Sequence, residues 1–299
     1  MIRYNKMKGA FNAPISVNVS LTDKCNAKCP FCFQPSGTGL ELSYQKLERL
    51  LYEMADMGVR LVQFSGGEPI LYSKLADAVS LATQLGLETR LSTSGIGLTK
   101  TMIKTLRNAG LGCCHISLNG SSKEIHEVTR SGYEDAIKAL YSLQDEGQKS
   151  KVNWVAMCQN AADFPRVIEL AHKFGAAGCE VISPKMMPSG TTPPICTSEQ
   201  LKELSDLCKK EKDFIFVESC FVSLRILVEG RMMGGIDKGC QAGRFFMSVD
   251  ARGRFNPCPH ISMPSCSKSI VEYWEHDAGV IRLRERFMSG KTYCSECLC

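Results

Sequence analysis

The stretch ISVNVSLTDKCNAKCPFC, residues 15 to 32, joins an apolar run to three closely spaced cysteines. The run at 15–21 has the alternation of a strand, and Cys25, Cys29 and Cys32 follow it on what should be one loop. Their thiolates form a soft donor set, which selects iron–sulfur or zinc over hard cations. Two interpretations remain open: a structural zinc site that borrows a distant ligand, and a [4Fe-4S] cluster with one iron left open for a substrate or cofactor.

Outward from this stretch, short apolar runs alternate with helical patterns. A helix should begin at Ser43 and end at Gly58, and further helices should end at glycines that can form left-handed C-caps: Gly86, Gly110, Gly147 and Gly175. Six strands are predicted at 15–21, 61–66, 87–93, 114–119, 152–157 and 179–184, with a seventh at 214–219.

Repeated βα units imply a parallel sheet with right-handed crossovers, either a partial barrel or an open doubly wound sheet. Both architectures place ligand sites beyond the carboxyl ends of the strands. The unusual residues follow those ends: the three cysteines, GGEP at 66–69, Ser94, Asn119, and PKMMPSG at 184–190. The agreement between motif and topology predicts one site at this end of the sheet.

Composition is that of an enzyme-sized globular chain of 299 residues, with 44% hydrophobic and 22% charged residues. The N-terminus has no run that suits a signal peptide or a membrane span, so we expect a cytoplasmic protein. In that compartment sixteen cysteines indicate metal ligation or thiol chemistry rather than disulfides. A formal charge of +5 without a basic run gives no reason to expect a nucleic-acid partner.

The motif CNAKCPFC, followed by GGEP, resembles that of the radical S-adenosylmethionine (SAM) enzymes over about residues 15 to 220. The resemblance implies a partial (β/α)6 barrel, a [4Fe-4S] cluster on Cys25, Cys29 and Cys32, and SAM bound to the open iron. It also implies an electron donor of the flavodoxin or ferredoxin type. Electron transfer into SAM then yields a 5′-deoxyadenosyl radical, which abstracts a hydrogen atom from the substrate.

The same resemblance implies a set of SAM-binding residues. The backbone of Gly66, Gly67 and Pro69, together with Glu68, would hold the SAM amino group, since glycines allow close approach and a carboxylate complements an ammonium. Ser94 resembles the hydroxyl residue that contacts the SAM ribose or carboxylate, and Asn119 is a weaker candidate beside it. Arg130 would bind the SAM carboxylate or pair with surface acids.

The C-terminal segment changes pattern beyond residue 230. Cys240 and Cys258 flank a predicted hairpin with its turn at 250–253, one helix is predicted at 269–287, and Cys294, Cys297 and Cys299 end the sequence. This resembles the first half of the SPASM extension, or twitch domain. The resemblance implies one auxiliary [4Fe-4S] cluster on Cys240, Cys258, Cys294 and Cys297, with Cys299 an alternative to Cys297 and a zinc ribbon the other interpretation. The expected divisions are a 1–14 extension, a 15–230 barrel and a 231–299 auxiliary domain.

The other cysteines are expected to be core residues, because a thiol behaves as a small hydrophobe. Cys266 differs: it stands in the loop HISMPSC and could return a hydrogen atom to a substrate radical, with Cys158 and Cys220 as weaker candidates. His126 and His260 are expected to be surface or hydrogen-bonded residues rather than ligands. The expected core set is Cys113, Cys114, Cys158, Cys179, Cys196, Cys208 and Cys220.

The sequence indicates the substrate less clearly than the cofactor. Relatives of the twitch and SPASM type mostly modify ribosomally made peptides, by crosslinking or epimerisation, while others oxidise or epimerise sugars. Only about fourteen residues precede the first strand, too few for a winged leader-peptide-binding domain. A peptide-modifying enzyme is therefore our first hypothesis and a dehydrogenase or epimerase of a sugar-like molecule the second. A non-enzymatic iron–sulfur or zinc-binding module is the hypothesis from another class.

Overall fold

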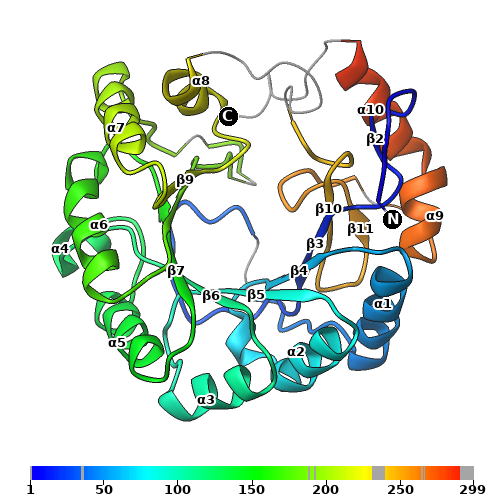
Figure 1. The fold of residues 1–299 in the computed structure, drawn as a ribbon, viewed down its shortest axis with the longest axis horizontal. Coiled ribbons are helices and arrows are strands. Elements are labelled where there is room, and N and C mark those ends of the chain that lie inside the picture. The colour runs from blue at the N-terminus through cyan, green and yellow to red at the C-terminus, as the bar shows by residue number, and fades with distance from the viewer. Residues whose placement is uncertain are drawn as a thin grey trace.

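A curved sheet with helices on its outer side forms most of the molecule (Figure 1). The computed structural model describes residues 2–34, 37–187, 189–191, 193–230, 240–263, 265 and 267–289. The strands are β1 (Tyr4–Asn5), β2 (Ala10–Phe11), β3 (Ser16–Ser20), β4 (Leu61–Ser65), β5 (Glu88–Thr93), β6 (Cys113–Ser117), β7 (Ser150–Val155), β8 (Cys179–Ile182), β9 (Ile215–Val217), β10 (Phe246–Val249) and β11 (Phe255–Asn256).

Helices connect these strands in βα order. The α-helices are α1 (Tyr44–Asp56), α2 (Leu75–Gln84), α3 (Lys100–Asn108), α4 (Lys123–His126), α5 (Tyr133–Asp145), α6 (Phe164–Lys173), α7 (Ser198–Lys210), α8 (Val222–Glu229), α9 (Ile270–His276) and α10 (Ala278–Met288). Two 3₁₀ turns, η1 (Pro69–Leu71) and η2 (Ala161–Asp163), complete the set. Ser43 caps α1 through its side chain, and Gly58 follows at φ +78°, as the sequence predicted.

The main sheet confirms the seven predicted parallel strands and adds two more. Its order is β11-β10-β3-β4-β5-β6-β7-β8-β9, and every neighbouring pair is parallel except β10 with β11. Because the helices lie outside a curved sheet rather than on both faces, the partial barrel is correct and the doubly wound alternative is wrong (Figure 1). The predicted hairpin exists, but β10 also pairs with β3, so the C-terminal segment continues the barrel sheet.

One prediction in this segment was wrong. The single helix expected at 269–287 is two helices, α9 and α10, separated at Asp277. Asp277 has extended backbone angles, φ −67° and ψ 120°, and its carboxylate accepts hydrogen bonds from the amides of Gly279 and Val280. An aspartate that caps a new helix N-terminus ends the preceding helix at the same point.

The N-terminal residues pack on the C-terminal segment. The indole Nε1 of Trp274 donates to the carbonyl of Phe11 at 2.9 Å, and Arg244 donates to the carbonyl of Gly9 at 2.7 Å. Tyr4, Phe11 and Phe245 form successive edge-to-face ring contacts. The β1–β2 hairpin thus packs against Arg244, Phe245 and helix α9.

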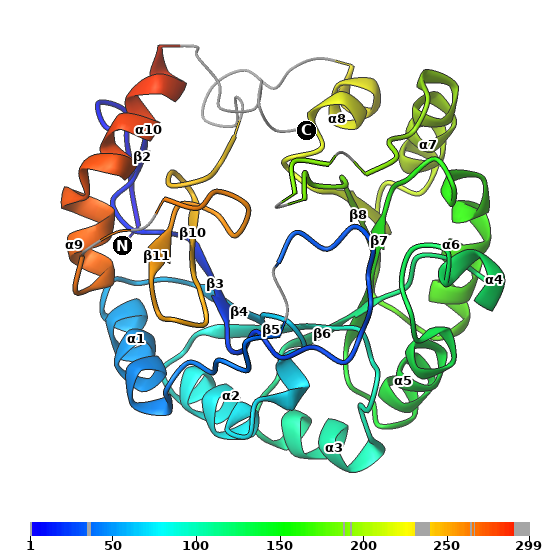
Figure 2. The same ribbon diagram turned by 180° about the vertical axis from the view of Figure 1, so that it is seen from behind.

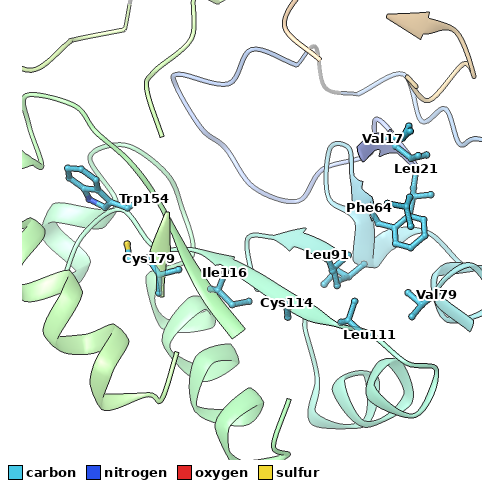
Figure 3. Packing of buried hydrophobic residues seen from close by; sticks show 14 of the residues in the cluster. Val17, Leu21, Phe64, Val79, Leu91, Leu111, Cys114, Ile116, Trp154 and Cys179 are labelled. Carbon is cyan, nitrogen blue, oxygen red and sulfur yellow. The ribbon is translucent and has the colours of Figure 1, made fainter. Parts of the chain in front are cut away.

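The hydrophobic core lies between the sheet and the helices. Successive side chains of a strand alternate between its two faces. The residues on the helix side are apolar and almost fully buried, and Figure 3 shows Val17, Phe64, Leu91, Ile116 and Trp154 among them.

The inner face of the sheet carries polar side chains instead. Ser65 donates to Asn18 at 2.7 Å, Gln63 donates to Ser92 at 2.9 Å, and His115 Nδ1 lies 3.0 Å from Asn153 Oδ1. Glu180 lies 3.6 Å from the same imidazole. The inside of the partial barrel is therefore a hydrogen-bonded polar surface rather than a second apolar core.

This inner surface predicts a pH dependence of stability. Burial alone would lower the pKa of His115, but hydrogen bonds and charge from Cys113 and Glu180 outweigh it and raise the pKa to about 9. The folded state holds the proton of His115 more tightly than the unfolded state does. Protonated His115 therefore stabilises the folded protein by about 3 kcal/mol below about pH 6.5, and this stabilisation is lost as the pH rises through about 9. Chemical denaturation of the apoprotein from pH 6 to 10 should show this loss. A His115→Gln variant should lack it, and an equal loss in that variant would contradict the assignment.

Candidate functional site

The first cysteine motif lies on the loop between β3 and α1, which crosses the inside of the ring of strands (Figure 2). Cys25, Cys29 and Cys32 line a single cavity of about 380 Å³, together with Gly67 of the loop after β4. The amide of Cys32 donates to the carbonyl of Cys29 at 3.0 Å, so the last two cysteines share a tight turn. The sequence prediction that cysteines and GGEP meet at one end of the sheet is confirmed.

Three hydrogen bonds to other parts of the chain hold this cysteine loop in place. The side chain of Asn26 donates to the carbonyl of Ile96 at 2.9 Å, beyond β5. The amide of Lys28 donates to the hydroxyl of Ser131 at 3.0 Å, beyond α4, and Gln34 donates to Ser20 at 3.2 Å. The loop is thus anchored at both ends of the cysteine motif.

The donor set and its surroundings fit an iron–sulfur cluster. Burial is the main cause that raises the pKa of the Cys25 and Cys32 thiols, so these groups need a nearby cation in order to ionise. Among the residues that the structure describes, no three His, Cys, Asp or Glu side chains converge on a position for one metal ion. A cubane cluster binds each cysteine at a different iron, so its ligands surround a cavity rather than converge on a point.

Gly66 and Gly67 allow the loop after β4 to lie directly against the chain before Cys25. A Cβ atom on Gly67 would stand 2.3 Å from the carbonyl oxygen of Lys24, and one on Gly66, at φ +139°, would stand 2.4 Å from that of Thr22. The amides of Gly67 and Glu68 donate across the same contact, each at 2.7 Å. Any larger residue must push the cysteine loop away.

Gly67→Ala should therefore displace the cysteine loop without unfolding the barrel. We expect the iron content after reconstitution to fall by up to half and 5′-deoxyadenosine formation to fall by about tenfold or more, as expected when a supporting contact of a metal site is lost. Iron analysis, product chromatography and circular dichroism would measure these effects. Gly86→Ala is the control: a Cβ there would meet nothing within 4 Å, and the φ of +78° disfavours alanine, so it should cost stability and leave iron content and product formation unchanged.

Glu68 is buried and makes all its hydrogen bonds within the protein. Its carboxylate accepts from the Thr93 hydroxyl at 2.6 Å, the Ser94 amide at 2.8 Å and the Ser94 hydroxyl at 2.5 Å. The amide of Ile70 approaches it at 3.4 Å. The two side chains predicted to contact SAM are thus bound to each other. The direct roles expected of Glu68 and Ser94 stay predictions, while the observed role is to fasten GGEP to the end of β5.

Arg130 and Asn119 follow β6, beyond the residues that line the cavity. Arg130 Nε is buried without a hydrogen-bond partner among the described residues, and the guanidinium opposes, as a minor effect, the burial that raises the pKa of Cys32. Its charge therefore reaches the cysteine loop. Asn119 donates to Thr129 at 3.1 Å and accepts from the amide of Val155 at 3.1 Å, so it fixes the segment before Arg130.

The two histidines that the sequence predicted to be surface or hydrogen-bonded residues differ: His126 is hydrogen-bonded and buried, whereas His260 is partly buried and its ring Nδ1 has no partner among the described residues. His126 Nδ1 accepts from the amide of Asn119 at 3.2 Å. Burial, followed by the charge of Arg130, lowers the pKa of His126 to about 4. Burial and then Lys185 lower the pKa of His260 to about 3, so both rings are neutral at pH 7.

Half of the predicted auxiliary ligand set lies within the described residues. Cys240 and Cys258 are buried in one small cluster with Ala242. The Cys258 sulfur accepts from the amide of His260 at 3.2 Å, and burial raises the pKa of this thiol to about 12. The two described cysteines therefore lie together, and the Cys258 thiol would ionise only beside a cation. Cys294 and Cys297, the alternative Cys299 and the proposed hydrogen donor Cys266 lie outside the described residues.

Most of the cysteines that the sequence predicted to be core residues are buried. Buried thiols are found at Cys113, Cys114, Cys179, Cys196 and Cys208, whereas Cys158 and Cys220 are only partly buried.

The sequence-based prediction missed two features of the site. The ring of Phe33, next to Cys32, contacts the ring of His260 with 4.0 Å between centroids, so the cysteine loop meets the segment after Cys258. Beyond β8, Lys185 is buried and donates to Glu218 at 2.7 Å. The only sequence signal for Lys185 was its place at a strand end, in PKMMPSG.

The fold and this site agree with the match of the chain to a known protein family. Residues 19–171, just over half of the chain, match the family model of the radical SAM superfamily. The chain belongs to that superfamily. Among the described residues, no helix is long and apolar enough to cross a membrane.

Curated relatives share modest identity with this radical SAM protein. A PqqA peptide cyclase of Rhodopseudomonas palustris is 28% identical, over 92% of this chain and 77% of its own. Mycofactocin maturase MftC of Mycolicibacterium smegmatis is 27% identical, over 96% and 76%. A PqqA peptide cyclase of Granulibacter bethesdensis is 30% identical, but the match spans only 56% of this chain and 46% of the relative.

Solved structures agree on the fold. Streptococcus suis SuiB bound to S-adenosylmethionine superposes with a TM-score of 0.80 at 18% identity, covering 93% of this chain and 69% of SuiB. The enzyme anSMEcpe bound to AdoMet gives 0.70 at 16% identity, covering 94% and 87%. At these identities the likeness shows the radical SAM partial-barrel architecture.

Proposed function

We propose that this radical SAM protein uses S-adenosylmethionine to start a radical modification of a ribosomally made peptide. The observation that carries the proposal is the single cavity lined by Cys25, Cys29, Cys32 and Gly67 at the carboxyl ends of the barrel strands. When bound there, a [4Fe-4S] cluster and SAM would supply a 5′-deoxyadenosyl radical for hydrogen abstraction, with electrons from a flavodoxin or ferredoxin.

The residues around the cavity have distinct parts in this proposal. The three cysteine thiolates would hold the cluster. The carbonyl oxygens of Gly66 and Gly67, which accept no hydrogen bond from the described residues, would receive the SAM amino group. The guanidinium of Arg130, whose Nε is unpartnered in the described chain, would bind the SAM carboxylate.

We also propose the auxiliary cluster. Cys240 and Cys258 are supported by their common buried position, and Cys294 with Cys297 or Cys299 would complete the ligand set. A cluster with four protein ligands has no open iron, so it would transfer electrons rather than bind substrate. The domain division at residue 231 belongs to the same proposal. The abundance of free thiols supports a cytoplasmic location.

The peptide class of substrate is supported by the relatives' names, a peptide cyclase and a mycofactocin maturase. The polar inner surface of the barrel, with Asn18, Gln63 and Asn153 among its side chains, suits backbone amides better than an apolar ligand. Crosslinking and epimerisation are both compatible with this proposal.

Anaerobic reconstitution tests the radical chemistry. The reconstituted protein should hold about eight irons per chain if two [4Fe-4S] clusters form. With dithionite it should convert SAM to 5′-deoxyadenosine and methionine. Bound zinc without iron, or SAM left intact, would contradict the proposal and favour a non-enzymatic binding module.

Co-expression tests the substrate class. Each short open reading frame near the gene is expressed with the enzyme, and the mass of the resulting peptide is measured by mass spectrometry. A loss of two hydrogens supports crosslinking, and deuterium gained from heavy water at unchanged connectivity supports epimerisation. Unmodified peptides, together with turnover of a sugar-like molecule, would support the dehydrogenase or epimerase hypothesis instead.

A further inference from the structure

The main sheet ends at β9, and no described strand pairs with the outer edge of β9 (Figure 1). On its other side, Glu218 donates its amide to β8 and Phe214 accepts an amide from β8, both at 2.9 Å. In this parallel pair, every second residue of β9 bonds to β8. Ile215 and Val217 therefore direct their backbone groups to the open side.

The open edge of β9 carries backbone donors and acceptors that bond to no described residue. They include the amide and the carbonyl of Val217 and the carbonyl of Ile215, whereas the amide of Ile215 donates to the carbonyl of Glu211 at 2.8 Å. Such an edge is a template for another extended chain, because a peptide strand offers the complementary donors and acceptors. The backbone of β9 therefore specifies an extended peptide as its ligand.

A cavity of about 400 Å³, here called the β9 groove, lies along this edge. Its volume is within the range of ligand pockets, roughly 300–1,000 Å³. Phe216 and Val217 of β9 line the groove together with Cys208 of α7, Val228 of α8, and Gln241 in the segment before β10. A peptide strand added to β9 would thus have space for its side chains between the strand edge and these two helices.

The charges of the β9 groove favour an acidic peptide. Arg225 and Glu229 line the groove as an ion pair, with 3.0 Å between Arg225 Nε and Glu229 Oε1, so their charges offset each other. Lys212 also lines the groove and forms no ion pair with a described residue, which leaves a net positive charge. Phe216, with 40% of its surface exposed, offers an apolar contact in the same groove. An acidic residue and an apolar one complement this surface.

We propose that the β9 groove binds an acidic, extended segment of the peptide substrate, added as a strand to the open edge. This inference rests on the peptide substrate of the proposed function, and the bound segment is one that does not react. Hydrogen bonds to Ile215 and Val217 would supply affinity, while Lys212 and Phe216 would select the sequence. Since the strands from β3 to β9 are parallel, β9 ends on the same side of the sheet as the cysteine loop.

Peptide binding to the full chain, reconstituted anaerobically, tests the proposal without turnover. The probe is a fluorescein-labelled hexapeptide of alternating glutamate and valine, and fluorescence anisotropy measures its dissociation constant, which we expect below about 1 mM. The fully N-methylated form of this peptide keeps the side chains and has no amide donor. It should bind about tenfold more weakly or worse, because the hydrogen bonds to the strand edge are lost.

Variants of the groove give a second measurement. Val217→Pro removes the outward amide and should weaken binding about tenfold, while the ladder to β8 survives because an edge strand tolerates proline where the amide faces away. Lys212→Glu should weaken binding of the glutamate peptide about two- to fivefold and strengthen binding of a lysine–valine peptide. Lys202→Glu, exposed on α7 and outside the groove lining, is the matched control and should change neither. Circular dichroism checks the fold of each variant.

The outcomes separate this inference from the proposed function. A probe that does not bind at about 1 mM, or an N-methylated probe that binds equally well, overturns the docking site even if SAM is cleaved. Probe binding with SAM left intact keeps the docking site and contradicts the radical chemistry. A dimer that Val217→Pro dissociates in analytical ultracentrifugation would place a second copy of the chain on the edge and also overturn the proposal. If Val217→Pro does not fold, the N-methylated probe still decides, because it leaves the protein unchanged.

Discussion

Cys29→Ala should abolish 5′-deoxyadenosine formation and remove about four irons per chain, the content of one [4Fe-4S] cluster. Cys29 is the middle one of the three proposed ligands on the loop, and its thiol lines the same cavity as Cys25 and Cys32. The turn itself should survive, because the amide of Cys32 bonds to the backbone carbonyl of residue 29. The loss should exceed the roughly 10–100-fold effect of changing an outer-shell partner of a metal site.

Iron analysis and product chromatography after anaerobic reconstitution measure both effects. Cys208→Ala is the matched control, since it removes a buried thiol of α7 that is remote from the cysteine loop in the chain. It should keep full iron and activity at a stability cost of about 1 kcal/mol. Retained SAM cleavage in Cys29→Ala would show that the open cluster is held elsewhere.

The barrel was predictable because its pattern is local. Each strand shows its own apolar alternation, and the helices before β4 to β8 each end at a glycine such as Gly86 or Gly110, which have φ of +78° and +96°. The pairing of β10 with β3 was not predictable, because it joins Phe246–Val249 to Ser16–Val19 across more than 200 residues. Nothing in either short run specifies which sheet edge it meets.

Some parts of the candidate site were likewise predictable from local sequence, and others were not. Ligand spacing identified Cys25, Cys29 and Cys32, which the structure brings to one cavity with Gly67. The hydrogen bonds of Glu68 depend instead on the register of β4 against β5, which decides that Thr93 and Ser94 end beside it. The ion pair of Lys185 joins the segment after β8 to Glu218 after β9, 33 residues away, and a single sequence carries no sign of that pairing.

Glu68→Gln should lower the free energy of unfolding by about 3 kcal/mol, because the variant loses charge-assisted hydrogen bonds inside the protein. The carboxylate accepts from three donors on Thr93 and Ser94, and an amide group would turn its own donor toward one of them. With almost no exposed surface, Glu68 has no water to replace the lost partner. The melting temperature of the apoprotein should fall by roughly 5–10 °C.

Thermal unfolding by circular dichroism under anaerobic conditions measures the change, and Glu169→Gln, on the exposed face of α6, should shift it by less than about 0.5 kcal/mol. SAM affinity of the reconstituted variant gives the second readout. If Glu68 acts by fastening GGEP to β5, stability and affinity fall together, since both depend on the place of the Gly66–Gly67 turn. If the variant is as stable as the wild type and loses affinity alone, the carboxylate binds the SAM amino group directly, and its bonds to Thr93 and Ser94 must open when SAM enters.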